Sequence, residues 1–327
     1  MLNALDKFGV VAIGRNEGER LKQCLRSLPK AVRVVYVDSG SSDKSTDWAR
    51  QFGVEVVELD TGLPFTAARA RNAGFSRLRQ LAPEIEYVQF VDGDCELVAG
   101  WTDHAIDFLE GHPNIAAVSG QRRERYPDRS IYNRLCDWEW NGPIGEGVAF
   151  GGDVMMRTTA FTAAKGYRDE LIAGEDPELC VRLRAMDWRV WRLGVAMTLH
   201  DAAIVSFGQW WRRSMRGGYA YAVGAYLHGT ESGHYRVWES CRAWIWGAAL
   251  PLLCVGSVLA FGAWGGLVLL IYPLQLARQV ARNPGPVYDR TLLATFQLLA
   301  RFPEVIGQLK FLFGYLLGSE PRLIEYK

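Results

Sequence analysis

The sequence predicts an α/β protein with a mixed, mainly parallel sheet, followed by a separate region of apolar helices. Over the first 120 residues, short runs rich in Val and Ile alternate with segments of helical periodicity. Such alternation with short connections indicates parallel strands joined by right-handed crossovers. The composition changes further along the chain, where residues 243–277 carry no charge. These observations predict a domain over residues 1–235 and a helical region over residues 236–327.

The elements of the first region follow from periodicity and from glycine and proline positions. One helical face repeats at i, i+3, i+4 and i+7 over residues 21–28, and Asn16 with Glu19 has the spacing of a helix cap. A proline in the first turn and neighbouring acids predict a helix beginning near Gly174. The expected strands are residues 8–14, 33–37, 54–59, 87–92, 150–157, 190–193 and 195–199, and further helices are expected at residues 45–51 and 66–80. The resulting sheet is of the type that binds nucleotides.

Composition excludes some classes of partner. The chain has 327 residues, with 37 Lys and Arg against 36 Asp and Glu. This balance gives no global attraction to nucleic acid, and we expect no nucleic-acid partner. The six cysteines are scattered without a CxxC pair or a metal-binding spacing, which favours reduced thiols.

Two acids at the end of a buried strand form the central feature of the sequence. The apolar run from Tyr87 ends in Asp92-Gly93-Asp94. Ligands collect at the carboxyl edge of open α/β sheets, and paired carboxylates suit a hard divalent cation that also bridges a diphosphate. An acidic loop that only solvates the strand end is the alternative.

Further acids and one histidine fall at predicted strand ends or helix starts. Asp38 and Asp153 follow predicted strands or lie within a glycine-hinged one. Glu175 and Asp176 lie at a predicted helix start, where a carboxylate acts either as a general base or as an N-terminal cap. His200 ends a short strand and is either a metal ligand or a structural histidine.

Several arginines are candidates for phosphate or nucleotide binding. Arg15 and Arg71 lie near the starts of helices that follow the first and third strands. A later cluster mixes Trp210 and Arg213 with further aromatic and basic residues over residues 209–219. That cluster suits either a leaving diphosphate or an anionic membrane surface.

The uncharged segment at residues 243–277 predicts a membrane-associated hairpin. It is too long for one upright span, and glycines near residues 262–266 favour two short helices. Arginines flank both ends, which under the positive-inside rule places both ends in the cytoplasm. A buried hairpin in a soluble protein is the alternative. Residues 288–317 mix apolar and charged side chains and predict amphipathic, interfacial helices.

Three common motifs do not occur in the sequence. It contains no G-x-x-x-x-G-K-S/T phosphate loop, no G-x-G-x-x-G after the first strand and no G-x-S-x-G nucleophile elbow. A P-loop nucleotidase, a dinucleotide-binding protein and an α/β-hydrolase are therefore disfavoured.

Taken in order, six sequence pieces resemble the family 2 glycosyltransferases, inverting enzymes with the GT-A fold. The resemblance covers most of residues 8–218. The pieces are Ala12-Ile13-Gly14-Arg15-Asn16-Glu17, Val37-Asp38-Ser39-Gly40-Ser41-Ser42-Asp43, Ala70-Arg71-Asn72-Ala73-Gly74, Asp92-Gly93-Asp94, Gly151-Gly152-Asp153 and Gly174-Glu175-Asp176-Pro177-Glu178-Leu179. There are departures: Gly14 and Arg15 replace the usual proline and tyrosine, Val37 replaces an acid, and Asp153 replaces a frequent asparagine.

The resemblance implies a role for each matching residue. Asp176 would be the catalytic base, with Glu175 beside it. Asp94 would bind Mg²⁺ or Mn²⁺, with Asp92 as a further ligand nearer the ribose or sugar. The nucleotide-sugar donor would contact Arg15, Asn16, Glu17, Asp38, Ser39, Gly40, Arg71, Asp92, Gly93 and Arg213, with Asp38 on the base. The acceptor would contact Gly152, Asp153 and Trp210.

The function expected from this resemblance is a metal-dependent, inverting transfer of sugar from a nucleotide-diphosphate sugar, here a UDP-sugar, to a hydroxyl of a lipid-linked or polysaccharide acceptor. Such enzymes commonly serve cell-envelope polysaccharide assembly. The enzyme would contact membrane lipids at the inner (cytoplasmic) membrane, with its catalytic domain in the cytoplasm. A polyprenyl-phosphate sugar synthase and a non-catalytic nucleotide-sugar-binding subunit are the alternatives.

Overall fold

The computed structural model describes residues 7–230, 234–318 and 324–325. The chain forms two compact units, Met1–Val205 and Ser206–Lys327, which are described separately. The helix that begins at Phe207 belongs to the second unit. The catalytic domain over residues 1–235 and the membrane-associated region over residues 236–327 stay predictions.

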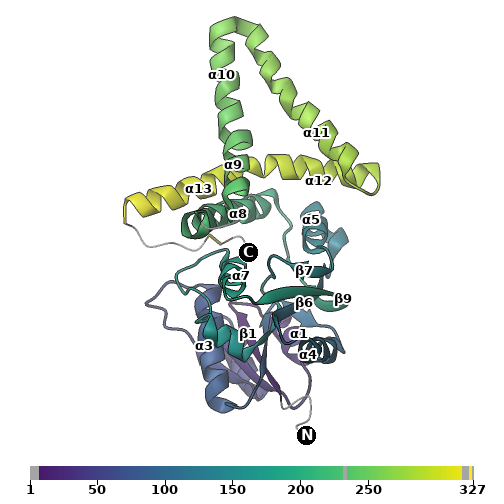
Figure 1. The fold of residues 1–327 in the computed structure, drawn as a ribbon, viewed down its shortest axis with the longest axis vertical. Coiled ribbons are helices and arrows are strands. Elements are labelled where there is room, and N and C mark those ends of the chain that lie inside the picture. Colours follow the sequence, from purple (N-terminus) through teal and green to yellow (C-terminus); the bar gives the residue numbers. More distant parts are fainter. Residues whose placement is uncertain (1–6, 231–233, 319–323, 326–327) are drawn as a thin grey trace. The chain divides into compact units, whose positions relative to one another are not determined.

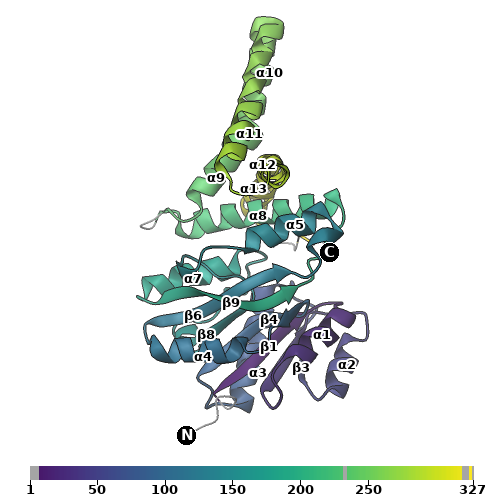
Figure 2. The ribbon, with the colours of Figure 1, turned by 90° about the vertical axis from the view of Figure 1, so that its right-hand side faces the viewer.

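A nine-stranded sheet forms the centre of the first unit (Figure 2). Its path is β3-β2-β1-β4-β8-β6-β9-β5, and β7 pairs with β9 beside it. Strands β1 to β4 are parallel, whereas β8 runs antiparallel to both β4 and β6. The strands are β1 (Phe8–Gly14), β2 (Arg33–Asp38), β3 (Glu55–Glu58), β4 (Tyr87–Asp92), β5 (Cys95–Leu97), β6 (Ile115–Glu124), β7 (Gly145–Gly147), β8 (Val154–Arg157) and β9 (Arg189–His200).

Helices cover both faces of this sheet, and alternate residues of each strand point to opposite layers. Val11 of β1 packs in the core under α3 (Ala67–Leu81), α6 (Thr158–Ala163) and α7 (Glu175–Ala185). Val10 packs on the other face, under α1 (Glu19–Ser27), α2 (Ser45–Gln51) and α4 (Trp101–Gly111). A 3₁₀ turn, η2 (Pro127–Arg129), and α5 (Ile131–Trp140) follow β6.

The predicted mixed, mainly parallel α/β fold is confirmed, with two local differences. The two short strands expected at residues 190–199 form one strand, β9, whose pairing with β6 is interrupted by register shifts. Asn16 does not cap α1: it adopts φ 56°, and Gly18 is the residue at the N-cap. The side chain of Asn16 instead accepts a hydrogen bond from the Ser42 backbone N–H at 2.7 Å.

The second unit is helical. It begins with α8 (Phe207–His228), where Ser206 and Gln209 form a capping box. The chain then forms α9 (Val237–Trp244), a π-helical turn η3 (Ile245–Ala249), α10 (Leu250–Phe261), a 3₁₀ segment η4 (Gly262–Leu270) and α11 (Ile271–Arg282). Helices α12 (Val287–Leu299) and α13 (Arg301–Leu316) follow.

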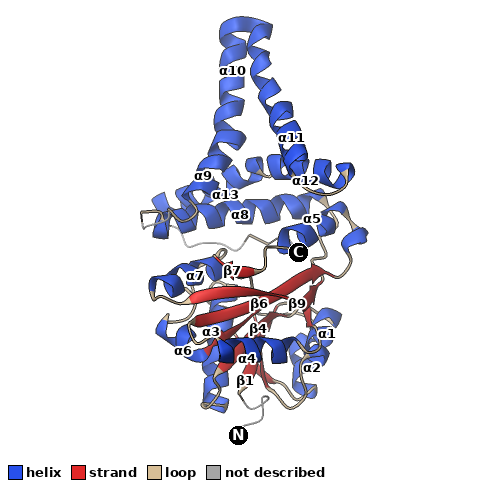
Figure 3. Ribbon diagram, turned by 45° about the vertical axis from the view of Figure 1, so that its right-hand side comes forward, coloured by secondary structure: helices blue, strands red, loops and turns tan. Residues whose placement is uncertain are grey.

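The segment from α9 to α11 forms a hairpin, as Figures 1 and 3 show. The chain reverses at Gly262, which has φ 60°. The arms touch closely near the tip, since a Cβ at Gly265 would lie 2.1 Å from the Ser257 carbonyl oxygen. Nearer the base, the Tyr272 hydroxyl donates to the Trp246 carbonyl oxygen at 2.6 Å. The predicted two-armed apolar hairpin is therefore present.

The hairpin is long and apolar enough to cross a membrane. The helical stretch Val237–Arg282 has 46 residues and a hydropathy of 2.1 in its most apolar window, of which 11% is buried. Its large apolar side chains are therefore exposed rather than packed in a core. Length and composition are compatible with membrane association.

Candidate active site

The Asp92-Gly93-Asp94 segment lies at the carboxyl end of β4, at the centre of the sheet. The Gly93 backbone N–H donates to the Ile13 carbonyl oxygen of the neighbouring strand at 2.7 Å. A Cβ at Gly93 would lie 3.0 Å from that same oxygen. Glycine therefore lets the turn stay close to β1 and direct both acids to the edge of the sheet.

Arg71 connects the acid pair with the start of α7. Its guanidinium, which is buried, donates to Asp92 Oδ1 at 2.8 Å and to Glu175 Oε1 at 3.0 Å. Asp176 Oδ1 lies 3.5 Å from Arg71 Nη1. The cation also lies 5.5 Å from the ring centroid of Tyr167. The structure thus brings together three sequence-predicted acids around one sequence-predicted arginine.

Gly152 makes this arrangement sterically possible. A Cβ at position 152 would lie 2.4 Å from Arg71 Nη2 and 2.6 Å from Asp92 Oδ2. No side chain fits there without moving the ion pair. The backbone at Gly152 therefore forms the wall against which Arg71 and Asp92 are held.

Asp176 has the acid–base properties of a general base. It lies in the first turn of α7 and is buried. Burial raises the pKa of its carboxyl to about 7; the nearby Arg71 opposes this rise, while Glu175 and Asp92 add to it. A base with a pKa near neutrality suits proton abstraction from a hydroxyl at physiological pH.

Asp153 holds the backbone of the acid pair through its side chain. Its Oδ1 accepts the Asp92 backbone N–H at 3.0 Å, and its Oδ2 accepts the Thr198 hydroxyl at 2.8 Å. Arg122 Nη2 lies 2.8 Å from the same Oδ2. The Asp153 side chain is fully buried, and despite this burial the Arg122 charge and the Asp92 N–H lower the pKa of its carboxyl. These contacts favour a positioning role, and acceptor contact by Asp153 stays a prediction.

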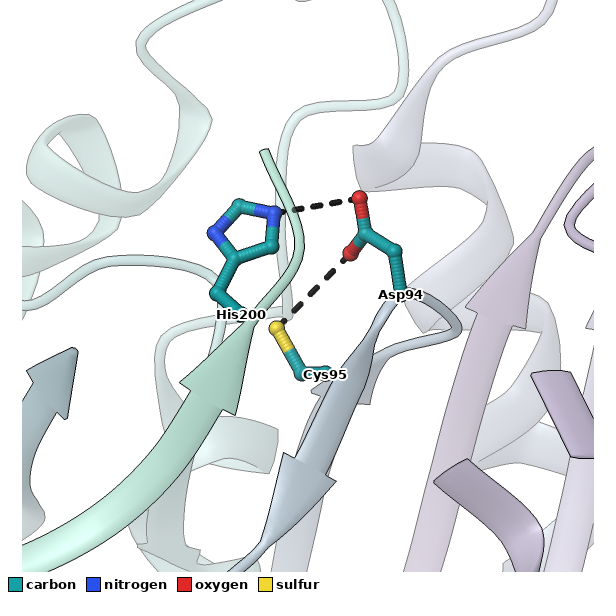
Figure 4. A group of neighbouring side chains, drawn as sticks. All are labelled: Asp94, Cys95 and His200. Atoms are coloured by element: carbon teal, nitrogen blue, oxygen red, sulfur yellow. Dashed lines mark hydrogen bonds and ion pairs between the residues drawn. The ribbon is translucent and has the colours of Figure 1, made fainter. Parts of the chain in front are cut away.

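Asp94 faces His200 and Cys95 (Figure 4). Its Oδ2 lies 3.0 Å from His200 Nε2, and its Oδ1 lies 3.7 Å from Cys95 Sγ. Trp140 stacks on the His200 ring at a centroid distance of 4.5 Å. Because a carboxylate and an imidazole converge here, these residues have the donor atoms to hold a divalent metal ion.

The loops after β1 and β2 carry the predicted nucleotide residues. Asp38 is 2% exposed, and its Oδ2 accepts the backbone N–H groups of Gly40 at 3.0 Å and Ser41 at 2.7 Å. The Ser39 N–H donates to the Gly14 carbonyl oxygen at 3.0 Å, which ties the two loops together. The Arg15 guanidinium lies 5.1 Å from the Phe65 ring centroid. Glu17 forms an ion pair with Arg20 at 2.7 Å.

Two predicted residues belong to the second unit. Trp210 is buried in α8, with its ring 4.9 Å from that of Phe296 in an edge-to-face contact. Arg213 lies on the same helix. Their predicted contacts with acceptor and donor stay predictions.

Sequence reasoning did not assign a role to four residues that the structure brings into the site: Cys95, Arg122, Trp140 and Thr198. Cys95 directly follows Asp94 in the sequence, and this position next to a predicted metal ligand could have identified it. Arg122 and Thr198 reach the site because they pair with each other across β6 and β9. Trp140, at the end of α5, reaches it by stacking on His200. Local sequence carries no sign of either contact.

Comparison with known proteins agrees with the fold. The sequence profile of glycosyl transferase family 2 matches residues 10–168. Glycosyltransferase AglE of Haloferax volcanii is 22% identical over 98% of this chain and 99% of its own length. Succinoglycan biosynthesis protein ExoA of Rhizobium meliloti is 24% identical over 54% of this chain and 57% of its own length.

Two solved structures resemble the fold over most of the chain. The first is a mannosyltransferase from Pyrobaculum calidifontis in complex with GDP-Man and Mn²⁺, with a TM-score of 0.60 and 18% identity, which covers 93% of this chain and 87% of that one. The second is S. aureus TarS residues 1–349 in complex with UDP-GlcNAc, with a TM-score of 0.52 and 16% identity, which covers 96% and 92%.

Proposed function

The chain belongs to glycosyl transferase family 2 and is a glycosyltransferase, and we propose that it moves a sugar with inversion from a nucleotide-diphosphate sugar to an acceptor hydroxyl. The observation that carries this proposal is the contact of Arg71 with Asp92 on one side and with Glu175 and Asp176 on the other. One guanidinium therefore lies between Asp92, in the segment expected to bind the donor, and Asp176, the expected base.

In this mechanism Asp176 accepts the proton of the acceptor hydroxyl. The deprotonated oxygen attacks the anomeric carbon on the side opposite the diphosphate, which leaves as nucleoside diphosphate. Burial keeps the pKa of Asp176 high enough for it to take that proton, and Arg71 and Gly152 hold the carboxylates in place.

Asp94 and His200 would hold the Mg²⁺ or Mn²⁺ ion. When bound, the ion supplies positive charge for the departing diphosphate. Support comes from the donor atoms that converge there and from the Mn²⁺ named in the Pyrobaculum complex. On the protein side, Asp153 holds the backbone beside Asp92 so that both acids keep their orientation.

The donor and acceptor are proposed at the level of class. A nucleotide-diphosphate sugar fits the fold, and the two solved relatives bind GDP-Man and UDP-GlcNAc. A UDP-sugar remains our preferred donor. A lipid-linked or glycan acceptor at the cytoplasmic face of the inner membrane is supported by the exposed apolar hairpin and by the succinoglycan relative.

Substitution of the proposed base tests this mechanism. We expect Asp176→Asn to reduce turnover by about 10³-fold or more, because the amide cannot accept the proton, while donor binding changes little. Asp103→Asn, in the first turn of α4, is the matched control on the exposed surface of the same unit. Transfer by Asp176→Asn at the rate of the unsubstituted enzyme would show that another group is the base.

The choice of acceptor distinguishes a polyprenyl-phosphate sugar synthase from an enzyme that transfers sugar to a hydroxyl. A phosphate acceptor is already ionised and needs no base. If the enzyme used polyprenyl phosphate and Asp176→Asn retained that activity, the protein would be a polyprenyl-phosphate sugar synthase and not an enzyme that transfers sugar to a hydroxyl. Absence of any metal-dependent donor turnover would favour the non-catalytic binding subunit.

A further inference from the structure

We propose that Asp94, Cys95 and His200 form a binding site for Zn²⁺, with the Cys95 thiolate as the third protein ligand, and that zinc bound there competes with the activating ion for Asp94. Zinc binding itself is independent of the proposed function. Only the competition rests on that function.

The backbone brings these three residues together. Cys95 and His200 are direct partners in the antiparallel pairing of β5 with β9, so their side chains project from the same face. The Asp201 backbone N–H donates to the Asp94 carbonyl oxygen at 3.1 Å, which continues the pairing past the strand ends. The register of β5 and β9 therefore brings the three residues together, whatever rotamers their side chains adopt.

The distances between the donor atoms suit a small tetrahedral ion. Asp94 Oδ2 and His200 Nε2 are 3.0 Å apart, and Asp94 Oδ1 and Cys95 Sγ are 3.7 Å apart. One ligand atom from each residue lies within 4.8 Å of the other two. Ligands about 2.0 to 2.3 Å from zinc in a tetrahedron are roughly 3.3 to 3.7 Å from one another. Small side-chain adjustments would therefore complete the site.

The surroundings restrict the movement of the ligands. Cys95 is fully buried, and His200 and Asp94 are nearly so. Trp140 stacks on the imidazole at an interplanar angle of 22°, and the Arg122 guanidinium lies 5.6 Å from the Trp140 ring centroid. This stack holds the plane of the His200 ring, so that Nε2 stays directed at Asp94 (Figure 4).

The chemistry of the donor set distinguishes zinc from the activating ions. Mg²⁺ prefers oxygen ligands, whereas thiolate and imidazole favour zinc and similar transition metals. On binding, the Cys95 thiol loses its proton to solvent as the sulfur–zinc bond forms, so one proton is released from this residue for each ion. Three protein ligands leave the fourth position for water.

The first experiment uses the unsubstituted full-length protein and Co²⁺, which is a spectroscopic probe of zinc sites. We expect the metal-free protein to bind Co²⁺ with a thiolate-to-cobalt charge-transfer absorption that Zn²⁺ abolishes on displacement. A pH indicator in weak buffer should report proton release during zinc binding. Binding of Co²⁺ without the charge-transfer absorption would show that Cys95 is not a ligand and would overturn the proposal.

The second experiment compares Cys95→Ser with Cys136→Ser. Cys136 is also buried in the first unit but contributes no atom to the cluster. With Zn²⁺ measured by chelator competition and Mn²⁺ by electron paramagnetic resonance, we expect Cys95→Ser to weaken zinc binding about tenfold or more, and manganese binding by a smaller factor. Equal zinc affinity in Cys95→Ser and the unsubstituted protein would refute the assignment. If Cys95→Ser does not fold, the cobalt spectrum of the unsubstituted protein decides.

Activity measurements then separate the site from the function. In the full-length enzyme, Zn²⁺ should inhibit donor turnover, and added Mn²⁺ should relieve the inhibition. Zinc binding without turnover under any condition would contradict the proposed function and leave the zinc site intact. Turnover that saturating Zn²⁺ leaves unchanged would refute the competition.

Discussion

Arg71 dominates the electrostatics of the site because three carboxylates share its one positive charge. Asp92, Glu175 and Asp176 all lie within 3.5 Å of its guanidinium. With three negative charges around one cation, ionisation of Asp176 is opposed by the charges of Glu175 and Asp92. The pKa of Asp176 therefore depends on the charges of Arg71, Glu175 and Asp92 as well as on its own burial.

The pH dependence of the reaction follows from this grouping. The pKa of Asp176 is about 7, raised by burial. Below that pH the carboxyl is protonated and cannot act as a base, so we expect kcat/KM to fall about tenfold per pH unit on the acid side. Because the Glu175 charge raises the pKa of Asp176, Glu175→Gln should move this midpoint to lower pH. A pH–rate profile of both proteins is the measurement, and an unchanged or higher midpoint in Glu175→Gln would contradict the prediction.

The two glycines before Asp153 allow a matched test of steric control. A Cβ at Gly152 would collide with Arg71 and Asp92, whereas a Cβ at Gly151 would have its nearest neighbour, an Arg122 nitrogen, at 3.9 Å. We expect Gly152→Ala to reduce kcat/KM by about 10²-fold, because a shift of about 1 Å in catalytic groups has this effect. Gly151→Ala should retain most activity. Equal activities of the two variants would show that the Arg71–Asp92 contact tolerates displacement.

Sequence predicted the acids of the site better than their supports. Asp92, Asp94, Glu175 and Asp176 were identified because each follows a strand end or begins a helix. The burial of Asp153 could not be foreseen, since it depends on Thr198 and Arg122 from distant parts of the chain. His200 was a weak candidate from its place at a strand end, and only the pairing of β5 with β9 brings it to Asp94.

At the scale of elements, helix packing in the second unit depends on two glycines. A Cβ at Gly218 of α8 would lie 2.1 Å from the Glu304 carbonyl oxygen of α13. A Cβ at Gly307 of α13 would lie 2.0 Å from the Met215 carbonyl oxygen of α8. The two backbones therefore cross in direct contact, as small residues at helix interfaces allow.

Adjacent glycines in α8 test this crossing. Gly218→Ala should destabilise the second unit by about 1 to 3 kcal/mol, because the helices must separate. A Cβ at Gly217 meets nothing within 4 Å, so Gly217→Ala should be neutral or stabilise by about 0.5 to 1 kcal/mol through helix propensity. Thermal unfolding in detergent compares the two variants. A loss of stability in Gly217→Ala equal to that in Gly218→Ala would contradict the close crossing.

The elements themselves were largely predictable, and their connections less so. Apolar periodicity located β1, β2, β4 and α3, since each has one dominant buried pattern. It divided β9 in two because Gly194 interrupts the run, although the strand continues through irregular pairing with β6. It also could not show that β8 runs antiparallel between β4 and β6.

At the scale of the whole molecule, the chain combines a well-packed α/β core with a hairpin in which many large apolar side chains are exposed. Leu252 is 71% exposed and Leu259 is 82% exposed. In water such a surface is unfavourable, whereas in a bilayer these side chains meet lipid. The hairpin therefore predicts that the full-length protein partitions into membranes and resists extraction by alkaline carbonate.

Charges placed in the middle of one arm test this prediction. Lysine near the centre of a membrane helix costs about 2.5 to 3.5 kcal/mol on insertion scales, so the double substitution Leu252→Lys with Val255→Lys should move much of the protein to the carbonate supernatant. Leu63→Lys, at an exposed leucine of the first unit, is the matched control and should leave the distribution unchanged. Centrifugation followed by immunoblotting measures the fractions. Because the substituted side chains are already exposed, loss of membrane binding cannot be attributed to disruption of a protein core. If the double variant stays in the pellet as the Leu63→Lys control does, another surface anchors the enzyme.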